Sequence, residues 1–352
     1  MLWVKKLGYT RLTCVKTKAN DWVIILDESI GIGQEKVLVI LGIREIDIDF
    51  TRPLRIQDME PLLVKSREKW QAADIANELN IIKQEIGTIL YAVADAGNSI
   101  RKSLEITNII WIYDITHAIA ITLSRMYKED KEFKEFARLS AQMRLKLYNS
   151  KQAHLIPPNQ RSKSRFLNID ILSNWAVQAL KAYHNPETCQ ADKQNLQWVK
   201  DMEEYVNVLE KIMSATQEIS IILKNNGLSK KTILRCKASL KGCNKGKLGQ
   251  FKKMILHQLT ENGNFLTKRN ENKLCCSDVI ETIFGKYKCE LSKNQMSGIT
   301  DLVLIIPALT AKLDVLSTTQ AIDNCTVKDI EIWKKKNLGD SLLSKRKSFF
   351  NN

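Results

Sequence analysis

Long apolar runs are missing from this sequence of 352 residues. No stretch reaches the roughly 18 consecutive apolar residues that a bilayer-spanning helix requires. The opening residues, MLWVKKLGYT, also lack the long apolar core and the small-residue cleavage site of a signal peptide. These absences argue against an integral membrane protein and against a secreted one, so we expect a cytosolic protein.

Histidines and paired cysteines are also scarce. The chain has four histidines and eight cysteines, and no two cysteines form a Cys-x-x-Cys pair. A zinc site drawn from Cys236, Cys243, His257 and Cys275 would have spacings that match no common ligand pattern. We therefore expect reduced thiols rather than structural zinc or a disulfide framework.

Acidic residues are outnumbered by basic ones. Lys and Arg total 54 against 39 Asp and Glu, which gives a formal net charge of +15 at pH 7. Such an excess favours a polyanionic partner, with nucleic acid first and an anionic membrane second. No strongly amphipathic, Lys-rich terminal helix stands out, which weakens the membrane alternative. With 44% hydrophobic residues, the chain can still bury a sizeable core.

The first third of the chain alternates between strand-like and helix-like patterns. Residues 22–26 (WVIIL) form a continuous apolar run that predicts a strand buried on both faces. Further strands are expected at 36–43, 46–50, 88–94 and 109–113, and helices at 70–82 and 99–106. The resulting order is strand, strand, strand, helix, strand, helix, strand. This is the order of a ribonuclease H-like core, an α/β fold with a mixed sheet flanked by helices.

Helical periodicity then takes over and predicts a large all-α insertion. The apolar spacing indicates helices at 118–148, 171–183, 196–225 and 231–259. We expect residues 1–20 to be the remnant of an N-terminal region and 21–117 the first part of the core. Residues 118–265 would be the insertion, and 266–352 the last part of the core with a basic C-terminal tail.

Three carboxylates are the candidate catalytic residues. Asp27 follows the first strand and Asp95 follows the fourth, and these strands lie side by side in a ribonuclease H-like sheet. Glu281 lies on a helix after the core, where Ser277 or Asp278 can cap the helix start. Clustered carboxylates are the ligands that Mg²⁺ prefers, and two such ions about 4 Å apart promote phosphodiester chemistry. The sequence therefore predicts that Asp27, Asp95 and Glu281 bind two Mg²⁺ ions.

These stretches together resemble a known family. DWVIILDESIGIG with KVLVILGI, AVADAGNSIRKSL, WIYDITHAIA, and SDVIETIFGKYK with KNQMSGIT resemble a bacterial insertion-sequence DDE transposase. Glu281 and Lys288 reproduce the family's Glu-six-residues-Lys pattern. The resemblance implies Mg²⁺ or Mn²⁺ dependence, and strand cleavage and transfer at the element's ends. It also implies double-stranded DNA as partner, a homo-oligomer on that DNA, and a place at the bacterial nucleoid.

Two residues are candidates for the second metal-binding acid. Asp95 resembles the Asp after the fourth strand in Mutator-like transposases, and it lies 68 residues after Asp27. Asp114 and His117 (DITH) then correspond to a fifth-strand motif that pairs a Cys or Asp with a His. The alternative makes Asp114 the metal ligand and Asp95 a turn residue; spacing favours Asp95. Any single Asp after a strand is often only a turn or helix cap.

DNA contacts are expected from a basic stretch. Between Lys224 and Lys273 there are thirteen Lys or Arg and only two acids. Lys230, Lys231 and Lys237 are the candidate phosphate contacts within it, together with Lys288 near the metals. Trp175 lies on an apolar helical face, where core packing is a better interpretation than stacking on a flipped base.

A separate domain that recognises the DNA sequence of the transposon ends is not evident. Only about twenty residues precede the first strand, so we expect that such a domain was either lost by truncation or is encoded in another frame. An active transposase is the first hypothesis. A truncated DNA-binding relic and a nuclease on the same fold are the alternatives, since fold alone does not determine substrate.

Overall fold

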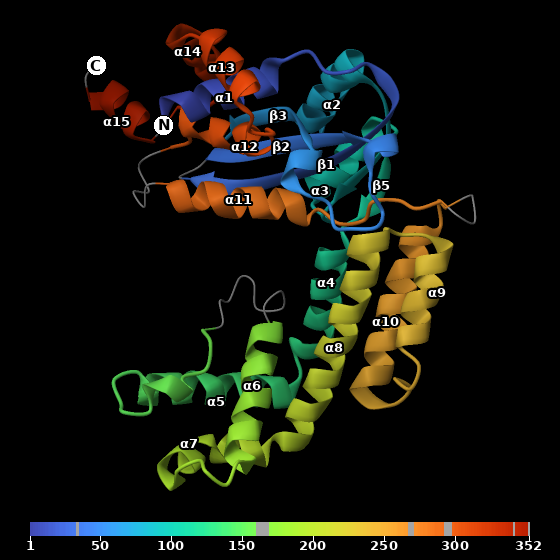
Figure 1. The fold of residues 1–352 in the computed structure, drawn as a ribbon, viewed down its shortest axis with the longest axis vertical. Coiled ribbons are helices and arrows are strands. Elements are labelled where there is room, and N and C mark those ends of the chain that lie inside the picture. The colour runs from blue at the N-terminus through green and yellow to red at the C-terminus, as the bar shows by residue number, and fades with distance from the viewer. Residues whose placement is uncertain (33–34, 160–168, 267–270, 292–297, 341, 351–352) are drawn as a thin grey trace. The chain divides into compact units, whose positions relative to one another are not determined.

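The computed structural model of the chain (Figure 1) describes every residue except 33–34, 160–168, 267–270, 292–297, 341 and 351–352. The chain divides into two units. Unit 1 combines Met1–Asp114 with Leu274–Asn352, and unit 2 is Ile115–Lys273. The expected helical insertion, 118–265, falls within unit 2.

Unit 1 is built on one mixed sheet of five strands in the order β3-β2-β1-β4-β5. β1 is antiparallel to β2, and β2 to β3, whereas β1 and β4 are parallel, as are β4 and β5. This arrangement confirms the expected α/β fold class with ribonuclease H-like topology. The strands are β1 (Ala19–Ile32), β2 (Glu35–Arg44), β3 (Glu60–Arg67), β4 (Gly87–Ala94) and β5 (Ile110–Tyr113).

The third strand does not lie where the sequence predicted it. Residues 46–50 were expected to be extended, but the chain there holds a short 3-10 helix, η1 (Glu45–Asp47), and Ile46 is 79% exposed. The strand lies instead at β3 and includes Pro61, opposite Leu41. Because β3 is at the sheet edge, the missing N–H of this proline removes no bond from the interior of the sheet.

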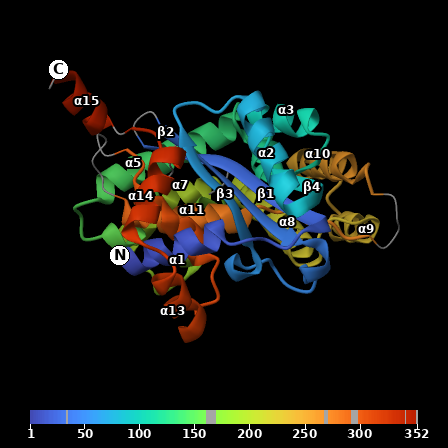
Figure 2. The same cartoon turned by 90° about the horizontal axis from the view of Figure 1, so that it is seen from above.

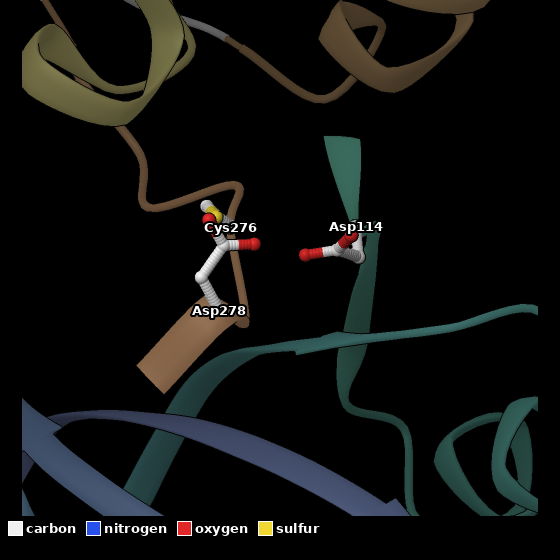
Figure 3. Close-up of side chains that lie close together, drawn as sticks. All are labelled: Asp114, Cys276 and Asp278. Atoms are coloured by element: carbon white, nitrogen blue, oxygen red, sulfur yellow. The ribbon is translucent and has the colours of Figure 1, made fainter. Parts of the chain in front are cut away.

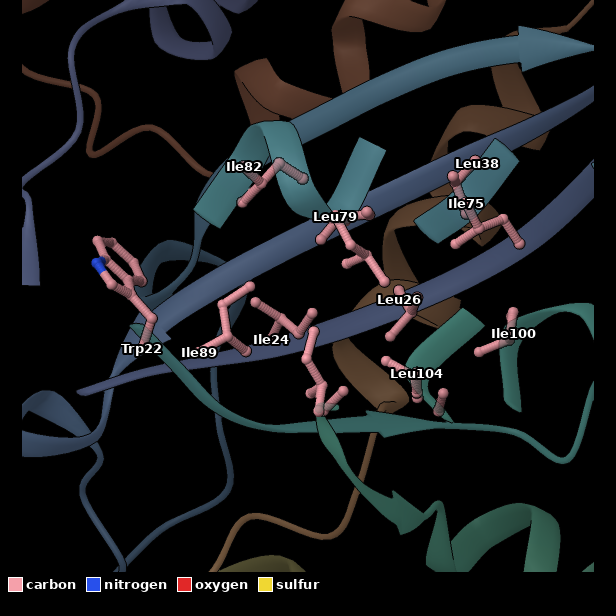
Figure 4. Close-up of a cluster of buried hydrophobic side chains, with 14 of the residues drawn as sticks. Trp22, Ile24, Leu26, Leu38, Ile75, Leu79, Ile82, Ile89, Ile100 and Leu104 are labelled. Atoms are coloured by element: carbon pink, nitrogen blue, oxygen red, sulfur yellow. The ribbon is translucent and has the colours of Figure 1, made fainter. Parts of the chain in front are cut away.

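The central strand β1 is buried on both faces. Trp22 is 2% exposed and every residue from Val23 to Leu26 is fully buried, as the apolar run predicted. Ile24 and Leu26 point toward α2 (Ala72–Ile86) and α3 (Asn98–Ile106), where they join one apolar cluster (Figure 4). Val23, Ile25 and Asp27 alternate to the other face, because successive side chains of a strand point to opposite sides.

Helices from both ends of the chain cover this second face. Helix α11 (Asp278–Glu290) packs against β1, and α1 (Leu2–Thr13) packs against β3. Figure 2 shows α2 and α3 along one side of the sheet and α1 along the other. The sheet therefore lies between two helical layers, and α11, which carries Glu281, covers the same face as Asp27.

The first helix is a packed part of unit 1. Gly8 of α1 lies so close to the carbonyl oxygen of Leu304 that an added Cβ would come within 1.9 Å of it. Leu7 joins an apolar cluster with Ala308, Ala311 and Ala321. The remaining elements are η2 (Ile56–Asp58), η5 (Asp301–Leu304), α12 (Ile305–Leu309), α13 (Val315–Asp323), α14 (Val327–Asn337) and α15 (Leu342–Phe350).

Unit 2 is helical throughout its described part, apart from an isolated bridge between Leu228 and Lys273. Three of the expected helices are each interrupted, the one expected at 196–225 at Met202. Asp130 starts a new helix by accepting a bond from the N–H of Phe133, and Gly242 adopts a φ of +90° between two others. The helices are α4 (Ile115–Tyr127), α5 (Lys131–Leu147), η3 (Ala153–Leu155), α6 (Ile169–His184), α7 (Gln190–Asp201), α8 (Glu203–Asn226), α9 (Lys230–Ser239) and α10 (Gly246–Gly263).

Aromatic side chains form much of the interior of unit 2. Phe136 contacts Trp198 and Tyr205, with ring centroids 5.8 and 5.5 Å apart. Trp175 stacks on Trp198 at 6.0 Å, in line with the core role that its helical face predicted. None of the helices in the described ranges is long and apolar enough to cross a membrane.

Candidate active site

Asp27 lies within β1 rather than at its end. The antiparallel pairing with β2 continues past the apolar run, so Asp27 is opposite Val39 and Glu28 is opposite Leu38. The parallel pairing with β4 stops earlier, at Ile25 and Val93. Asp27 is partly buried. Its backbone is therefore held on one side by β2, at the point where the neighbouring strand β4 is about to end.

Asp95 is the first residue after β4. Its Oδ1 accepts a hydrogen bond from the N–H of Gly97 at 2.9 Å, which shapes the turn into α3. The negative charge of Asp95 also reaches Glu28. Burial and this neighbouring charge raise the pKa of Glu28, against the opposing effect of Lys36. Asp95 thus follows the end of β4, and Asp27 lies in the adjacent parallel strand, just past the last residue of β1 that pairs with β4.

Glu281 lies in the first turn of α11, as the sequence predicted. It is partly buried, and its neighbours Ile280 and Ile283 are fully buried. Lys288 is exposed two turns further along the same helix. The downstream stretch KNQMSGIT falls largely on residues 293–297, which lie outside the described residues.

Asp114 is fully buried and is bonded to the start of α11. Its Oδ2 accepts the N–H of Ser277 at 2.5 Å and the Ser277 hydroxyl at 2.8 Å. Ser277 occupies the N-cap position of α11, but its hydroxyl makes no capping bond to the helix. The expectation that Ser277 caps the helix is therefore wrong for its side chain, because the buried carboxylate binds the hydroxyl instead.

Asp114, Cys276 and Asp278 form a compact cluster. One ligand atom of each lies within 4.8 Å of those of the other two (Figure 3). Within the described part of the chain, this is the only group of three or more His, Cys, Asp or Glu that is this close. Sequence reasoning did not single out Cys276, and it treated Asp278 as a helix cap. The Cys-x-Asp spacing at the helix start was the signal available for it.

The cluster suits a soft or borderline cation better than Mg²⁺. A thiolate prefers zinc and other transition metals, whereas Mg²⁺ prefers oxygen ligands in an octahedral arrangement. Asp114 also already accepts two hydrogen bonds from Ser277. Asp27, Asp95 and Glu281 offer oxygen atoms only, so their donor chemistry fits Mg²⁺ or Mn²⁺. Their role as a ligand set stays a prediction.

The basic candidates differ in their surroundings. Lys230, Lys231 and Lys237 are exposed on α9, and none forms an ion pair with a described residue. Lys247 belongs to the same basic stretch but bonds to Asp130 and Glu132, at 2.9 and 2.7 Å. In the C-terminal tail, Lys345 forms an ion pair with Glu68. Exposed and unpaired cations are the ones available to a DNA phosphate.

The cysteines agree with the expectation of unbridged thiols. No disulfide joins any of the eight, all of which are described. Cys236 is buried, and burial raises the pKa of its thiol to about 12. Cys236, Cys243 and His257 do not come together as a cluster among the described residues of unit 2.

No protein-family model matches the sequence, and no curated protein does. Among solved structures, the chain is similar to the Drosophila P element transposase strand transfer complex, with 11% sequence identity and a TM-score of 0.43. The match covers 90% of this chain and 85% of that one. At so distant a likeness, the ribonuclease H-like assignment rests on the order and direction of the strands.

Proposed function

We propose that this protein is a DNA transposase that cleaves and joins strands at the ends of a mobile element. The observation that carries the proposal is that Asp27 and Asp95 each lie two residues past the last paired positions of the adjacent parallel strands β1 and β4. Glu281 comes from a helix that packs against the first of these strands. Such a frame holds carboxylates rigidly enough to bind metal ions in a defined geometry.

The three acids are proposed to hold two Mg²⁺ or Mn²⁺ ions. When bound, such a pair activates the attacking oxygen and stabilises the leaving one. The chain supplies the orientation. The backbone of Asp27 is held by pairing with β2, and the Asp95 carboxylate is held by Gly97. Glu281 is held by the buried neighbours Ile280 and Ile283.

Duplex DNA is the proposed partner. The net charge of +15 favours a polyanion. The exposed and unpaired lysines of α9 are the proposed phosphate contacts in unit 2, and Lys288 is the proposed contact beside the metals. Transposition joins two element ends, so we also propose that the active form is a homo-oligomer assembled on DNA.

The test is strand transfer by the purified full chain, with Mg²⁺, DNA from the flanks of its own gene, and a target plasmid. Asp27→Asn, Asp95→Asn and Glu281→Gln should each reduce the rate by at least about 10²-fold, as expected for loss of a preorganised charged group. Their affinity for DNA should stay unchanged. Glu85→Gln is the matched control, since Glu85 is exposed on α2 in the same unit.

Three results would replace the proposal. Cleavage without joining would indicate a nuclease on the same fold. DNA binding without cleavage, in either metal, would indicate a transposition-incompetent relic. Full activity of Asp95→Asn with loss in Asp114→Asn would move the second metal ligand to Asp114.

A further inference from the structure

The helix that carries Glu281 is far in sequence from the sheet it packs on. All of unit 2, Ile115–Lys273, intervenes between the end of β5 and the start of α11. Short connections usually restrict where a helix can pack on a sheet, and here there is none. The position of α11 must therefore be determined by contacts that its own residues make with the sheet.

Asp114 makes a buried polar contact at the start of this helix. It is the last residue before unit 2 and is fully buried, and its N–H bonds to the carbonyl of Ala94 at 3.0 Å. Its Oδ2 accepts both the N–H and the hydroxyl of Ser277, 163 positions later. Hydrogen bonds to a carboxylate are about twice as strong as those between neutral groups. The carboxylate also lies beside the positive end of the helix dipole.

A second contact holds the same segment from the neighbouring strand. Tyr91 of β4 is 1% exposed, and its hydroxyl oxygen accepts the N–H of Leu274 at 2.9 Å. Leu274 is the first residue of unit 1 after the insertion. The returning chain is therefore bonded to β4 at Leu274 and to the end of β5 at Ser277, both through buried side chains.

These bonds determine where Glu281 lies. Ser277 is at the N-cap and Glu281 is four residues further on, about 6 Å along the helix axis. Because an α-helix is stiff over one turn, a shift at Ser277 is passed on to Glu281 nearly undiminished. A displacement of about 1 Å in a reacting group can lower a rate by roughly 10²-fold.

We propose that Asp114 is a positioning residue that acts through Ser277. It joins the two ends of the helical insertion and sets the position of Glu281 relative to Asp27 and Asp95. This inference rests on the proposed function for its kinetic consequence. The clamp itself, defined as the bonds of Asp114 to Ser277 and of Tyr91 to Leu274, can be tested without any activity.

The structural test is amide hydrogen exchange of the full chain, with Asp114→Asn, Ser277→Ala and Tyr91→Phe. Exchange at the first turn of α11 should become about tenfold faster in Asp114→Asn, and less so in the two milder variants. Ser103→Ala is the control, since the buried hydroxyl of Ser103 bonds only within α3. If Asp114→Asn proves too unstable to study, Ser277→Ala and Tyr91→Phe each remove a single bond. Their exchange rates at α11 then test the clamp.

The kinetic test separates positioning from metal binding. Asp114→Asn keeps one acceptor oxygen, so kcat should fall about tenfold, while Asp114→Ala should lose about 10²-fold. The Kd for DNA and the Mn²⁺ affinity, measured by electron paramagnetic resonance, should stay within about twofold. In the Ser277→Ala background, Asp114→Ala should cost less than it does alone, because the two residues share bonds.

Each possible outcome of these two tests supports or overturns a stated part of the proposal. Unchanged exchange at α11 in all three variants would overturn the clamp, whatever the enzyme does. Loss of Mn²⁺ binding in Asp114→Asn would make Asp114 a ligand rather than a positioning residue. If the wild-type protein transfers no strands but the exchange at α11 rises as expected, the clamp stands and the proposed function fails.

Discussion

Ile25 of β1 is paired with Val93 of β4 in a parallel register. Two residues further along their chains lie Asp27 and Asp95, so the two acids follow the last paired positions of adjacent strands. The start of α11 is held at this same edge, through the bond between Asp114 and Ser277. Three segments that are far apart in the sequence thus bring carboxylates toward one end of the sheet.

This arrangement predicts that Mn²⁺ stabilises the protein against heat. A ligand at 100 times its Kd adds about 2.7 kcal/mol, which corresponds to a rise of roughly 5–11 °C in Tm for a unit of this size. Asp27→Asn, Asp95→Asn and Glu281→Gln should each abolish most of the rise. Differential scanning calorimetry with and without Mn²⁺ measures it.

Glu85→Gln should keep the full rise, because Glu85 is exposed on α2. The informative contrary result involves the cluster of Asp114, Cys276 and Asp278. If Asp278→Asn loses the rise and Asp27→Asn keeps it, the cation binds at the cluster and not at the predicted triad.

The order of the strands was predictable because a buried strand has a simple pattern of apolar residues in the sequence. The apolar run at residues 22–26 identified the central strand, since only a strand covered on both faces lacks polar alternation. The edge strand was misplaced in the prediction because it is less buried and lacks this apolar pattern. Pro61 and Lys65 make β3 look like a loop, although an edge strand tolerates both.

DNA binding should depend on the exposed lysines of α9. Replacing Lys230, Lys231 and Lys237 together by Glu should weaken duplex binding at least about tenfold. It should also reduce the slope of log K against log salt by about 2 to 3, because each phosphate contact releases close to one counterion. Fluorescence anisotropy at several salt concentrations measures both quantities.

A matched set of charge-reversal variants outside α9 controls for a general effect of net charge on DNA binding. Lys128, Lys131 and Lys211 are also exposed in unit 2 and form no ion pair with a described residue. Reversing these three changes the net charge equally and should leave the slope within about 1 of wild type. If both triple variants lower the slope alike, α9 is not a specific contact surface.

The candidate site was only partly predictable, and the reason is sequence separation. Asp27 and Glu281 were proposed from local patterns, an acid after an apolar run and a helix with an acid in its first turn. The bond of Asp114 to Ser277 spans 163 positions and leaves no local signal. Cys276 was missed for the same reason, since its neighbours in space come from β5 and not from its own segment.

Two helical glycines should respond oppositely to alanine. At Gly8 an added Cβ would lie 1.9 Å from the backbone oxygen of Leu304, so α1 must move and Gly8→Ala should cost about 1–3 kcal/mol. At Gly285 of α11 nothing lies within 4 Å. Alanine there should stabilise by about 0.5–1 kcal/mol through helix propensity.

Urea unfolding of both variants measures the difference in the free energy of unfolding. Equal and small effects would mean that α1 does not pack against the Leu304–Ala308 segment.

Lys247 should matter for stability and not for DNA binding, although it lies in the basic stretch. Its ammonium group bonds to Asp130 and Glu132 and lies 4.9 Å from the ring centre of Tyr205. Burial works to lower its pKa, but the bonds to these two acids outweigh it and raise the pKa. The lysine charge is therefore already compensated within unit 2.

Lys247→Met should cost about 1–2 kcal/mol of stability, since it leaves the partly buried Asp130 without its partner. The salt slope of DNA binding should stay unchanged, because no charge free to bind phosphate is lost. Lys253→Met is the control on the same helix, where the side chain is exposed, and should change stability by less than about 0.5 kcal/mol. A lower slope in Lys247→Met with intact stability would show that DNA displaces the two acids from this lysine.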